Sequence, residues 1–524
     1  MKFYGKLSVY ICIICFEEKW KLNSNKGIKN VIWGIFAQVV TIGIGIMIPR
    51  LVLVNLGSEA NGLMNSINSI LSYMSLLEAG VGTATLQALY TPFSKDDHNS
   101  INRIMSATHF FYKRTGYIYL AIVMLLSISY VFVVETSLPK IYVFLVVILA
   151  GLSGVISYFF QGKYRIFLSA EGKGYITTNI ATISNVGVSL LKALLLVNGA
   201  NVVMIQMVYF IFNFFQMLFI VIYMHKCYRW LDLKVKPDFE AISQKKAVMV
   251  HQIAELIFNN TDMVILTIFT TLKTVSVYSM YAMIFGMVKS VTVTLSDGFL
   301  YALGQSYHDK KRFLRMHDAY EVYNMAVTFA MFCIAGILIL PFLRLYTKGV
   351  SDINYIDSYV ALLFMLFYLL SNGRKSSQIV INFAQHFEKT KWRAVAESVI
   401  NLTVSILLTK KCGIYGVLLG TIVALLYRTN DVIIYAAKLM KRSAIITYKR
   451  WLVDFLLFVV IYCGVTKLNL DFSSYLSIFI NGSILSIIII FVFVVVNSVL
   501  ELDTAKYVFC ILKNGFRRKS ENEK

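Results

Sequence analysis

Seven Arg and Lys side chains lie within long apolar stretches of this 524-residue chain: Arg50, Lys192, Lys289, Arg344, Arg374, Lys375 and Arg428. A cation at the centre of a membrane-spanning helix costs about 2.5–3.5 kcal/mol on insertion scales. A chain that keeps several such cations must surround them with water or hold them against anionic groups. The pattern therefore favours a wet cavity at membrane depth that receives a negatively charged ligand.

Four of these cations are the best candidates for binding phosphate oxygens: Arg50, Lys289, Arg374 and Lys375. Arg50 follows Pro49, which removes a backbone donor and kinks a helix, although an Arg at this depth can also extend to the outer interface. Lys289 lies near the centre of the apolar stretch 281–294, too deep to reach either interface. It must face an aqueous cavity or pair with an acid.

Arg374 and Lys375 lie in a polar interruption of an otherwise apolar segment, Leu-Ser-Asn-Gly-Arg-Lys-Ser-Ser-Gln at 370–378. Gly373 loosens the helix, and the hydroxyl groups that follow can satisfy backbone groups that the break releases. A broken helix that carries cations suits anion binding at membrane depth. A re-entrant bend or an early exit into the inner loop is the alternative.

The other three cations, Lys192, Arg344 and Arg428, lie nearer the ends of their segments. We expect these side chains to extend to the membrane interface. Arg428 also lies three residues before Asp431, and we expect the two to pair.

Polar and acidic residues occur in the same regions: Glu78, Glu255, Asn259, Asp262 and Asp297. Glu255 and Asp262 are seven residues apart, which places them on one helix face with Asn259 between them. Such a stripe predicts a cavity lining. Its role is either a Na⁺ or H⁺ coupling site or the neutralisation of Arg50 and Lys289. We expect no other cofactor and no metal centre.

The elements that must position these residues are membrane-spanning helices. The chain is 58% hydrophobic and 15% charged, whereas soluble domains carry about 25% charged residues. We expect about fourteen spans, near 31–54, 61–90, 115–134, 142–161, 176–198, 202–224, 248–271, 275–300, 322–346, 358–381, 394–409, 414–437, 451–466 and 474–498.

The net charge of +22 is distributed as a membrane topology signal rather than as a nucleic-acid patch. The outer loops hold only six of the 50 Lys and Arg residues: Lys140, Lys273, Lys348, Lys410, Lys411 and Lys467. The excess on the other side predicts a multi-pass plasma-membrane protein with both termini in the cytoplasm. The outer loops are too short to hold a folded catalytic domain.

Two halves of the chain repeat a pattern. Pro49-Arg50 and Leu77-Glu78-Ala79-Gly80 in the first half correspond to Thr261-Asp262 and Leu295-Ser296-Asp297-Gly298 in the second. Because six spans separate the copies, the repeats are parallel and should form two six-helix lobes around a central cavity. The expected divisions are a leader at 1–30, an N-lobe at 31–246, a C-lobe at 247–437 and a C-terminal helix pair with a basic tail at 438–524.

Motifs for other chemistry are weak or missing in the sequence. Cys12 and Cys15 form an isolated CxxC without a second ligand pair, so we favour chance over a metal or redox site. The chain contains no GxxxxGK[ST] phosphate loop and no HExxH zinc motif. These features favour transport over enzymatic activity.

The run from Pro49-Arg50 through Asn55-Leu-Gly-Ser-Glu-Ala-Asn-Gly-Leu63, followed by Leu77-Glu-Ala-Gly-Val-Gly82 and Tyr90, resembles the Wzx-type polysaccharide repeat-unit flippases. These belong to the multidrug/oligosaccharidyl-lipid/polysaccharide exporter superfamily. The similarity covers nearly the whole chain, apart from the leader, which departs from the family pattern. It implies translocation of an undecaprenyl-pyrophosphate-linked oligosaccharide from the inner to the outer leaflet, for capsule, exopolysaccharide or O-antigen synthesis.

The resemblance also implies partners, namely the lipid-linked glycan, membrane lipids, a polysaccharide polymerase and glycosyltransferases. Three other functions stay open from the sequence. The chain could be an ion-coupled multidrug exporter of the same superfamily, a membrane-embedded polymerase or acyltransferase, or a structural membrane protein. The buried cations argue against the last of these, and the short outer loops against the enzymes.

Overall fold

The computed structural model describes residues 43–78, 80–242, 246–297, 299–307, 309–468 and 470–511. The expected leader at 1–30, the start of the first span, Cys12 and Cys15 lie outside these residues, as do Ala79 and Gly298 of the repeated motifs. The described residues are helical or in short connections, with no strand among them. The predicted all-α class is confirmed.

The chain divides into two compact units, which we describe separately. The first comprises Met1–Ala60 and Ile70–Met249, and the second comprises Asn61–Ser69 and Val250–Lys524. Asn61–Ser69 falls within the range expected for the N-lobe but groups with the second unit. Its side chains bond there, since Asn61 Nδ2 donates to Ser276 Oγ at 2.7 Å and the Ser66 and Thr267 hydroxyls are 2.7 Å apart.

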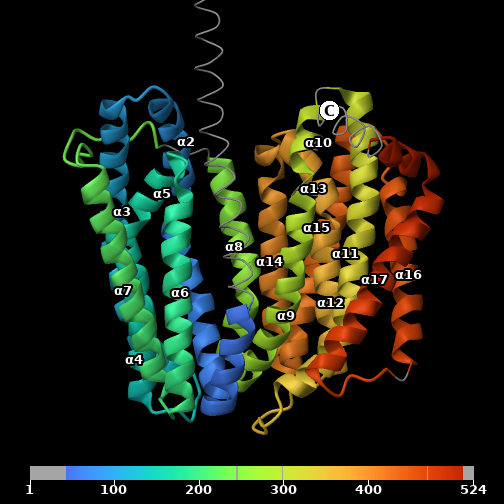
Figure 1. Cartoon of the computed structure of the whole chain (residues 1–524), viewed down its shortest axis with the longest axis horizontal. Helices are drawn as coiled ribbons and strands as arrows, with labels where there is room; N and C mark the ends of the chain where they lie inside the picture. The colour runs from blue at the N-terminus through green and yellow to red at the C-terminus, as the bar shows by residue number, and fades with distance from the viewer. Residues whose placement is uncertain are drawn as a thin grey trace, which may run out of the picture. The chain divides into compact units, whose positions relative to one another are not determined.

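The first unit begins with helical residues from Gly43 onward (Figure 1). Gly57 lies among these helical residues where the first outer loop is expected, and its φ of 82° is a backbone conformation that other residues rarely adopt. The remaining helices follow in chain order: a 3₁₀ turn η1 (Tyr73–Leu77), α2 (Val81–Ser94), α3 (His98–Val133), α4 (Lys140–Ile156), a π-helical turn η2 (Ser157–Gln161), α5 (Gly162–Ala170), α6 (Gly174–Val197) and α7 (Val202–Cys227).

The second unit is a longer bundle, also drawn in Figure 1. It contains most of α8 (Lys246–Phe269), then α9 (Leu272–Asp297), α10 (Leu300–Ser306), α11 (Lys310–Tyr346), α12 (Ser358–Gly373), α13 (Lys375–Phe383), α14 (Phe387–Cys412), α15 (Ile414–Met440), α16 (Ile445–Thr466) and α17 (Tyr475–Leu500). The central helix α11 packs against α9, α12, α16 and α17. Its buried residues are rich in Phe, Ala and Ile.

Each half contains one very long helix in third position, α3 with 36 residues and α11 with 37. Both start with an Asp cap, because the side chain of Asp97 accepts from Ser100 N–H and that of Asp309 accepts from the Lys311 and Arg312 N–H groups. The stretches between the expected spans at 61–90 and 115–134, and between those at 275–300 and 322–346, are therefore mostly helical and not open loops. The charged residues of these stretches lie on helices that extend beyond the apolar spans. Hydropathy alone does not detect such extensions.

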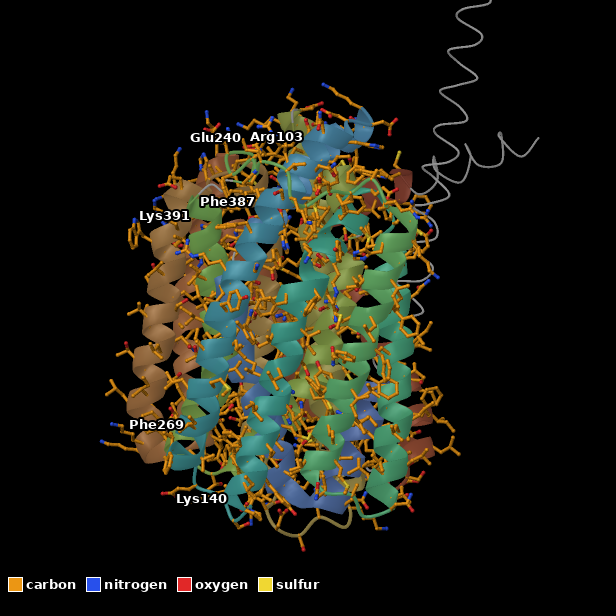
Figure 2. All side chains as sticks on the ribbon, turned by 90° about the vertical axis from the view of Figure 1, so that its left-hand side faces the viewer. Arg103, Lys140, Glu240, Phe269, Phe387 and Lys391 are labelled. Atoms are coloured by element: carbon orange, nitrogen blue, oxygen red, sulfur yellow. The ribbon has the colours of Figure 1, made fainter. Side chains whose placement is uncertain are left out.

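Loops alternate between the two ends of each unit, as a series of spans requires. In the first unit, Arg103 and Glu240 lie at one end and Lys140 at the other (Figure 2). In the second unit, Phe269 lies opposite Phe387 and Lys391 in the same view. This matches the sequence-based assignment of which loops share a side.

Nine of the described helical segments are long and apolar enough to cross a membrane by length and composition. Helices α8, α12, α14 and α16 do not reach that standard, although each corresponds to an expected span. They are short or carry polar residues such as Asp262, Glu397 and Asp454. Three of these four helices, α8, α14 and α16, carry buried charged residues.

Candidate functional site

The polar interruption in the second unit is a genuine helix break. Helix α12 ends at Gly373, α13 starts at Lys375, and Arg374 between them is a turn residue with φ −74° and ψ −8°. The sequence-based prediction of a break at this position is confirmed. Two cations therefore lie where the regular backbone hydrogen bonds are interrupted.

Arg374 begins a chain of alternating charges that runs from the break to α14 and α15. Its Nη1 donates to Glu397 Oε1 of α14 at 2.8 Å, and Arg428 Nε of α15 lies 3.3 Å from Glu397 Oε2. Arg428 Nη1 then donates to Asp431 Oδ2 at 2.7 Å, and Arg393 pairs with the other oxygen of Asp431. Three guanidinium groups share two carboxylates, so the chain keeps one formal positive charge.

Lys375 and Lys289 lie near the same break. Lys375 Nζ donates to Asp297 Oδ1 at 2.8 Å, and this pair is accessible, with the Asp297 side chain 51% exposed. Lys289 is in the electrostatic field of Glu255, Arg374 and Lys375. Among the described residues, Lys289 has no carboxylate oxygen within 4 Å. The structure thus brings together three of the four cations proposed to bind phosphate.

The fourth cation, Arg50, is half-buried and belongs to the first unit. Glu78 lies in the same unit, directly after η1, and its carboxylate accepts a hydrogen bond from the Tyr112 hydroxyl. The positive charge of Arg165 attracts the Glu78 carboxylate, and Arg165 Nη2 donates a hydrogen bond to Gln161 Oε1 at 2.6 Å. The sequence does not single out Arg165, which falls beyond the expected span at 142–161, because helix α5 continues from α4 past that limit.

The polar stripe on α8 separates into two environments. Glu255 and Asn259 are exposed, whereas Asp262 is only 4% exposed. The three residues therefore do not share one environment, because α9 and α15 cover the Asp262 end of the helix. Tyr278 of α9 donates to Asp262 Oδ2 at 2.9 Å, and Thr421 of α15 lies 3.0 and 2.9 Å from the two carboxylate oxygens.

Asn401 of α14 completes the surroundings of Asp262. It is fully buried, and its Nδ2 donates to Thr421 Oγ1 at 2.8 Å. Its carbonyl oxygen has no hydrogen-bond partner among the residues that the structure describes. A buried carboxylate without a described cationic partner, beside an unused carbonyl oxygen and a hydroxyl, is a donor set suited to a proton or a small hard cation. Asn401 and Thr421 were missed because single Asn and Thr residues are common in membrane helices.

Two of the three cations expected at the interface are buried instead. Lys192 is 8% exposed, and its amine lies 5.2 Å from the centre of the Tyr209 ring. Arg428 is 3% exposed because it pairs with Glu397 and Asp431, so only its predicted pairing with Asp431 is confirmed. Arg344 is exposed near the end of α11. Partner side chains on neighbouring helices, which spacing does not reveal, retain Lys192 and Arg428 inside the bundle.

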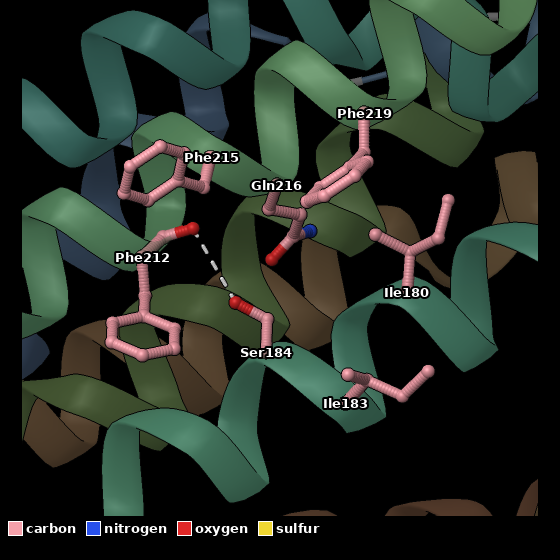
Figure 3. Close-up of a pocket in the computed structure, with 7 residues that line it drawn as sticks. All are labelled: Ile180, Ile183, Ser184, Phe212, Phe215, Gln216 and Phe219. Atoms are coloured by element: carbon pink, nitrogen blue, oxygen red, sulfur yellow. Dashed lines mark hydrogen bonds between the residues drawn. The ribbon is translucent and has the colours of Figure 1, made fainter. Parts of the chain in front are cut away.

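A cavity of about 350 Å³ lies between α6 and α7 in the first unit (Figure 3). Its lining is mostly aromatic and aliphatic: Ile180, Ile183, Ser184, Phe212, Phe215, Gln216 and Phe219. The Ser184 hydroxyl donates to the Phe212 carbonyl at 3.4 Å, which leaves little polar surface for a charged ligand. This cavity suits hydrocarbon and not the anion that the cations of the second unit favour.

A second charged cluster joins α11 to the C-terminal helices. His317, Asp318 and Glu321 present ligand atoms close enough together to hold a metal ion. Both carboxylates are however bound by guanidinium groups, since Arg442 and Arg450 each pair with Asp318 and with Glu321. A divalent cation would have to compete with two fixed positive charges, so these residues fit an ion-pair cluster better than a metal site.

This cluster predicts a stability effect. Glu321 is fully buried, and we expect Glu321→Ala to lower the free energy of unfolding by about 3–5 kcal/mol, because it leaves Arg442 and Arg450 without a buried carboxylate. Thermal unfolding of the detergent-solubilised protein measures the change. Glu388→Ala is the matched control, since Glu388 is 67% exposed in its pair with Lys391 and should leave the midpoint nearly unchanged. Equal midpoints for the two variants would contradict the assignment.

Solved structures share this arrangement of helices. A lipid II flippase MurJ in an inward closed conformation matches with a TM-score of 0.64 and 16% identity, over 90% of this chain and 98% of that chain. An inward-facing multidrug resistance MATE transporter of the MOP superfamily matches with a TM-score of 0.58 and 15% identity, over 78% and 99%. The MATE multidrug transporter DinF-BH matches with a TM-score of 0.57 and 13% identity, over 80% and 95%.

No protein-family model and no curated protein matches the sequence. At identities of 16% and below, the structural matches concern the fold. The chain therefore has the all-helical fold of the MurJ and MATE transporters, which confirms the predicted architecture. The substrate has to be argued from the charged residues themselves.

Proposed function

We propose that this protein is a flippase that moves an undecaprenyl-pyrophosphate-linked oligosaccharide from the inner to the outer leaflet of the bacterial plasma membrane by alternating access. The glycan would serve capsule, exopolysaccharide or O-antigen synthesis. The observation that carries the proposal is the convergence of Lys289, Arg374 and Lys375 at a helix break in the second unit. The fold supports it, because one of the matched structures is a lipid II flippase.

The chemistry of these cations suits a pyrophosphate. The planar guanidinium of Arg374 binds one carboxylate oxygen at present and can present the same donors to a phosphate. Lys289 contributes an ammonium group that no described carboxylate neutralises at close range. The Lys375–Asp297 pair is exposed enough for a phosphate oxygen to replace the carboxylate. Arg50 of the first unit would provide a further cation in the same role.

The membrane potential can drive the outward movement. An inside-negative potential favours the transfer of an anion to the outside by about 2.3 kcal/mol per charge for each 100 mV. The carrier then needs a return step, for which we propose Na⁺ or H⁺ binding at Asp262 with Asn401 and Thr421. The charge beside the anion site would be balanced by Glu255, Asn259 and Asp297. In the first unit, Glu78 would balance the charge of Arg165.

Orientation and partners complete the proposal. The excess of Lys and Arg in the loops on one side supports an orientation with both termini in the cytoplasm. Glycosyltransferases that build the glycan on its lipid would supply the substrate on that side. A polysaccharide polymerase would consume it on the other side.

A multidrug exporter is the second candidate function. It is favoured by the buried carboxylate of Asp262 and by the fold match to MATE multidrug transporters. The two functions need cavities of opposite charge, because the substrates of multidrug exporters are commonly cations. Cations at the helix break therefore favour the flippase.

The direct test uses the purified full-length protein in vesicles of phosphatidylethanolamine and phosphatidylglycerol. The vesicles contain undecaprenyl diphosphate that carries a fluorescent oligosaccharide, and a membrane-impermeant quencher reports which leaflet holds it. We expect protein-dependent exchange of the glycolipid between leaflets and no accumulation of the cationic dye ethidium. Dye accumulation driven by a Na⁺ or H⁺ gradient, without movement of the glycolipid, would establish the multidrug alternative.

Lys289→Gln tests the anion site in the same assay. Loss of one charge-assisted contact with phosphate, worth about 1.5–3 kcal/mol, should lower transport by at least about tenfold. Lys289→Arg keeps the charge and should retain most of the activity. Lys348→Gln is the control, because Lys348 is exposed in an outer loop. Full activity of Lys289→Gln at normal abundance would remove Lys289 from the site.

A further inference from the structure

The helix break is in direct contact with α16 of the C-terminal helix pair. The indole ring of Trp451 packs on Gly373 so closely that a Cβ atom at residue 373 would clash with Trp451 Cζ2 and lie 2.7 Å from Cη2. The ring also packs edge to face with Phe329 of α11, at a centroid distance of 5.3 Å. Residue 373 therefore has to be glycine while Trp451 occupies this position.

A second connection reaches the first turn after the break. The carbonyl oxygen of Ser376 lies 3.1 Å from His317 Nε2, and the Ser376 hydroxyl lies 3.5 Å from Glu321 Oε1. Both partners are on α11 and are fully buried. The segment that follows Lys375 is thus attached to the same charged cluster that holds α16.

Arg450 joins this cluster to both C-terminal helices. From α16, its Nη1 donates to Asp318 Oδ1 at 2.9 Å and also to Glu321, while its Nε donates to Glu501 Oε1 at 2.9 Å, just after α17. Thr447, one turn earlier on α16, donates to Glu321 Oε1 at 3.0 Å. Helix α16 therefore contacts the break directly at Gly373 through Trp451, and it is linked to Ser376 indirectly through Glu321 of α11.

We propose that α16 sets the position of the helix break, so that Trp451 and Arg450 are positioning residues for the anion-binding side chains of Arg374 and Lys375. The inference rests on the proposed function, because it takes Arg374 and Lys375 as the groups that bind the anion. A binding site needs its charged groups fixed by the packing of the residues behind them. The C-terminal helix pair then belongs to the substrate site and is more than a membrane anchor.

The contact between Gly373 and Trp451 can be tested by enlarging the side chain at residue 373 and reducing the one at residue 451. Gly373→Ala should lower glycolipid exchange by at least about tenfold, because the new methyl group has no space. Trp451→Phe removes the ring atoms nearest residue 373. In that background, Gly373→Ala should therefore lower glycolipid exchange by less than about threefold. If the double variant loses as much exchange as the product of the losses in Gly373→Ala and Trp451→Phe alone, the contact does not position the break and the inference is overturned.

A second measurement reports the geometry of the break without transport. Spin labels at the exposed residues Asn382 of α13 and Lys311 of α11, in a variant without native cysteines, give the distance between the two helices within this unit. We expect Trp451→Ala to shift or broaden this distance and to weaken binding of undecaprenyl diphosphate in phosphatidylcholine vesicles. Trp392→Ala is the matched control, because Trp392 is 71% exposed on α14.

The outcomes separate this inference from the proposed function. An unchanged distance in Trp451→Ala overturns the positioning role, whatever happens to transport. A changed distance with weakened binding supports it. If the distance changes but Arg374→Gln still binds undecaprenyl diphosphate normally, the positioning of the break stands and the anion-site assignment fails.

Discussion

Arg374→Gln is expected to lower glycolipid transport by about ten- to a hundredfold while leaving the protein folded in the membrane. The loss follows from one charge-assisted hydrogen bond to phosphate, worth about 1.5–3 kcal/mol. The fold should tolerate the change because Glu397 keeps Arg428 as a partner at 3.3 Å. Transport in reconstituted vesicles and abundance in membranes measure the two effects separately.

Arg393→Gln is the matched control for this prediction. Arg393 lies at the other end of the same chain of charges, its side chain is 40% exposed, and Asp431 retains Arg428 at 2.7 Å without it. We expect this variant to transport within about threefold of the original, since a surface ion pair contributes about 1 kcal/mol or less. Equal losses in the two variants would mean that Arg374 acts only through the stability of the network.

Asp262→Asn is expected to abolish the response of transport to an ion gradient. The substitution keeps the shape of the side chain and its contacts with Tyr278 and Thr421, but removes the negative charge that would hold a cation or accept a proton. Without coupling, the rate should fall by about tenfold, to the level driven by the membrane potential alone. Transport measured with a Na⁺ gradient and with a pH gradient identifies the ion.

Two comparisons make the Asp262 experiment decisive. Thr421→Val removes a hydroxyl ligand while keeping the acid, so it should weaken Na⁺ dependence more than H⁺ dependence. Asp471→Asn changes an acid in an exposed connection and should leave the response intact. A normal gradient response in Asp262→Asn would exclude this residue as the coupling site. A wild-type protein that ignores both gradients would exclude ion coupling altogether.

The fold was largely predictable because membrane insertion leaves a strong signal in the sequence. Apolar length identified the spans, and the asymmetry of Lys and Arg identified which loops share a side. The helix break was also predictable, since Gly373 and the polar residues after it interrupt an apolar segment. Helical extensions beyond the membrane, such as the first turns of α3 and α11, carry polar residues and give no hydropathy signal.

Partners across helices were much harder to predict. The Arg428–Asp431 pair was found because three residues separate its members on one helix. Glu397 binds both Arg374 and Arg428 from a different helix, and no sequence spacing indicates that contact. For the same reason, Asp262 was expected on an open polar face, although helices α9 and α15 cover it.

The pairing of Arg374 with Glu397 has a consequence for how the protein is made. These residues lie on α12–α13 and α14, which are consecutive spans in the order of synthesis. Either charge alone would oppose entry of its segment into lipid, by up to about 2.5–3.5 kcal/mol. We therefore expect the translocation channel to retain the first segment until the second emerges, and to release both into the bilayer together as a neutralised hairpin.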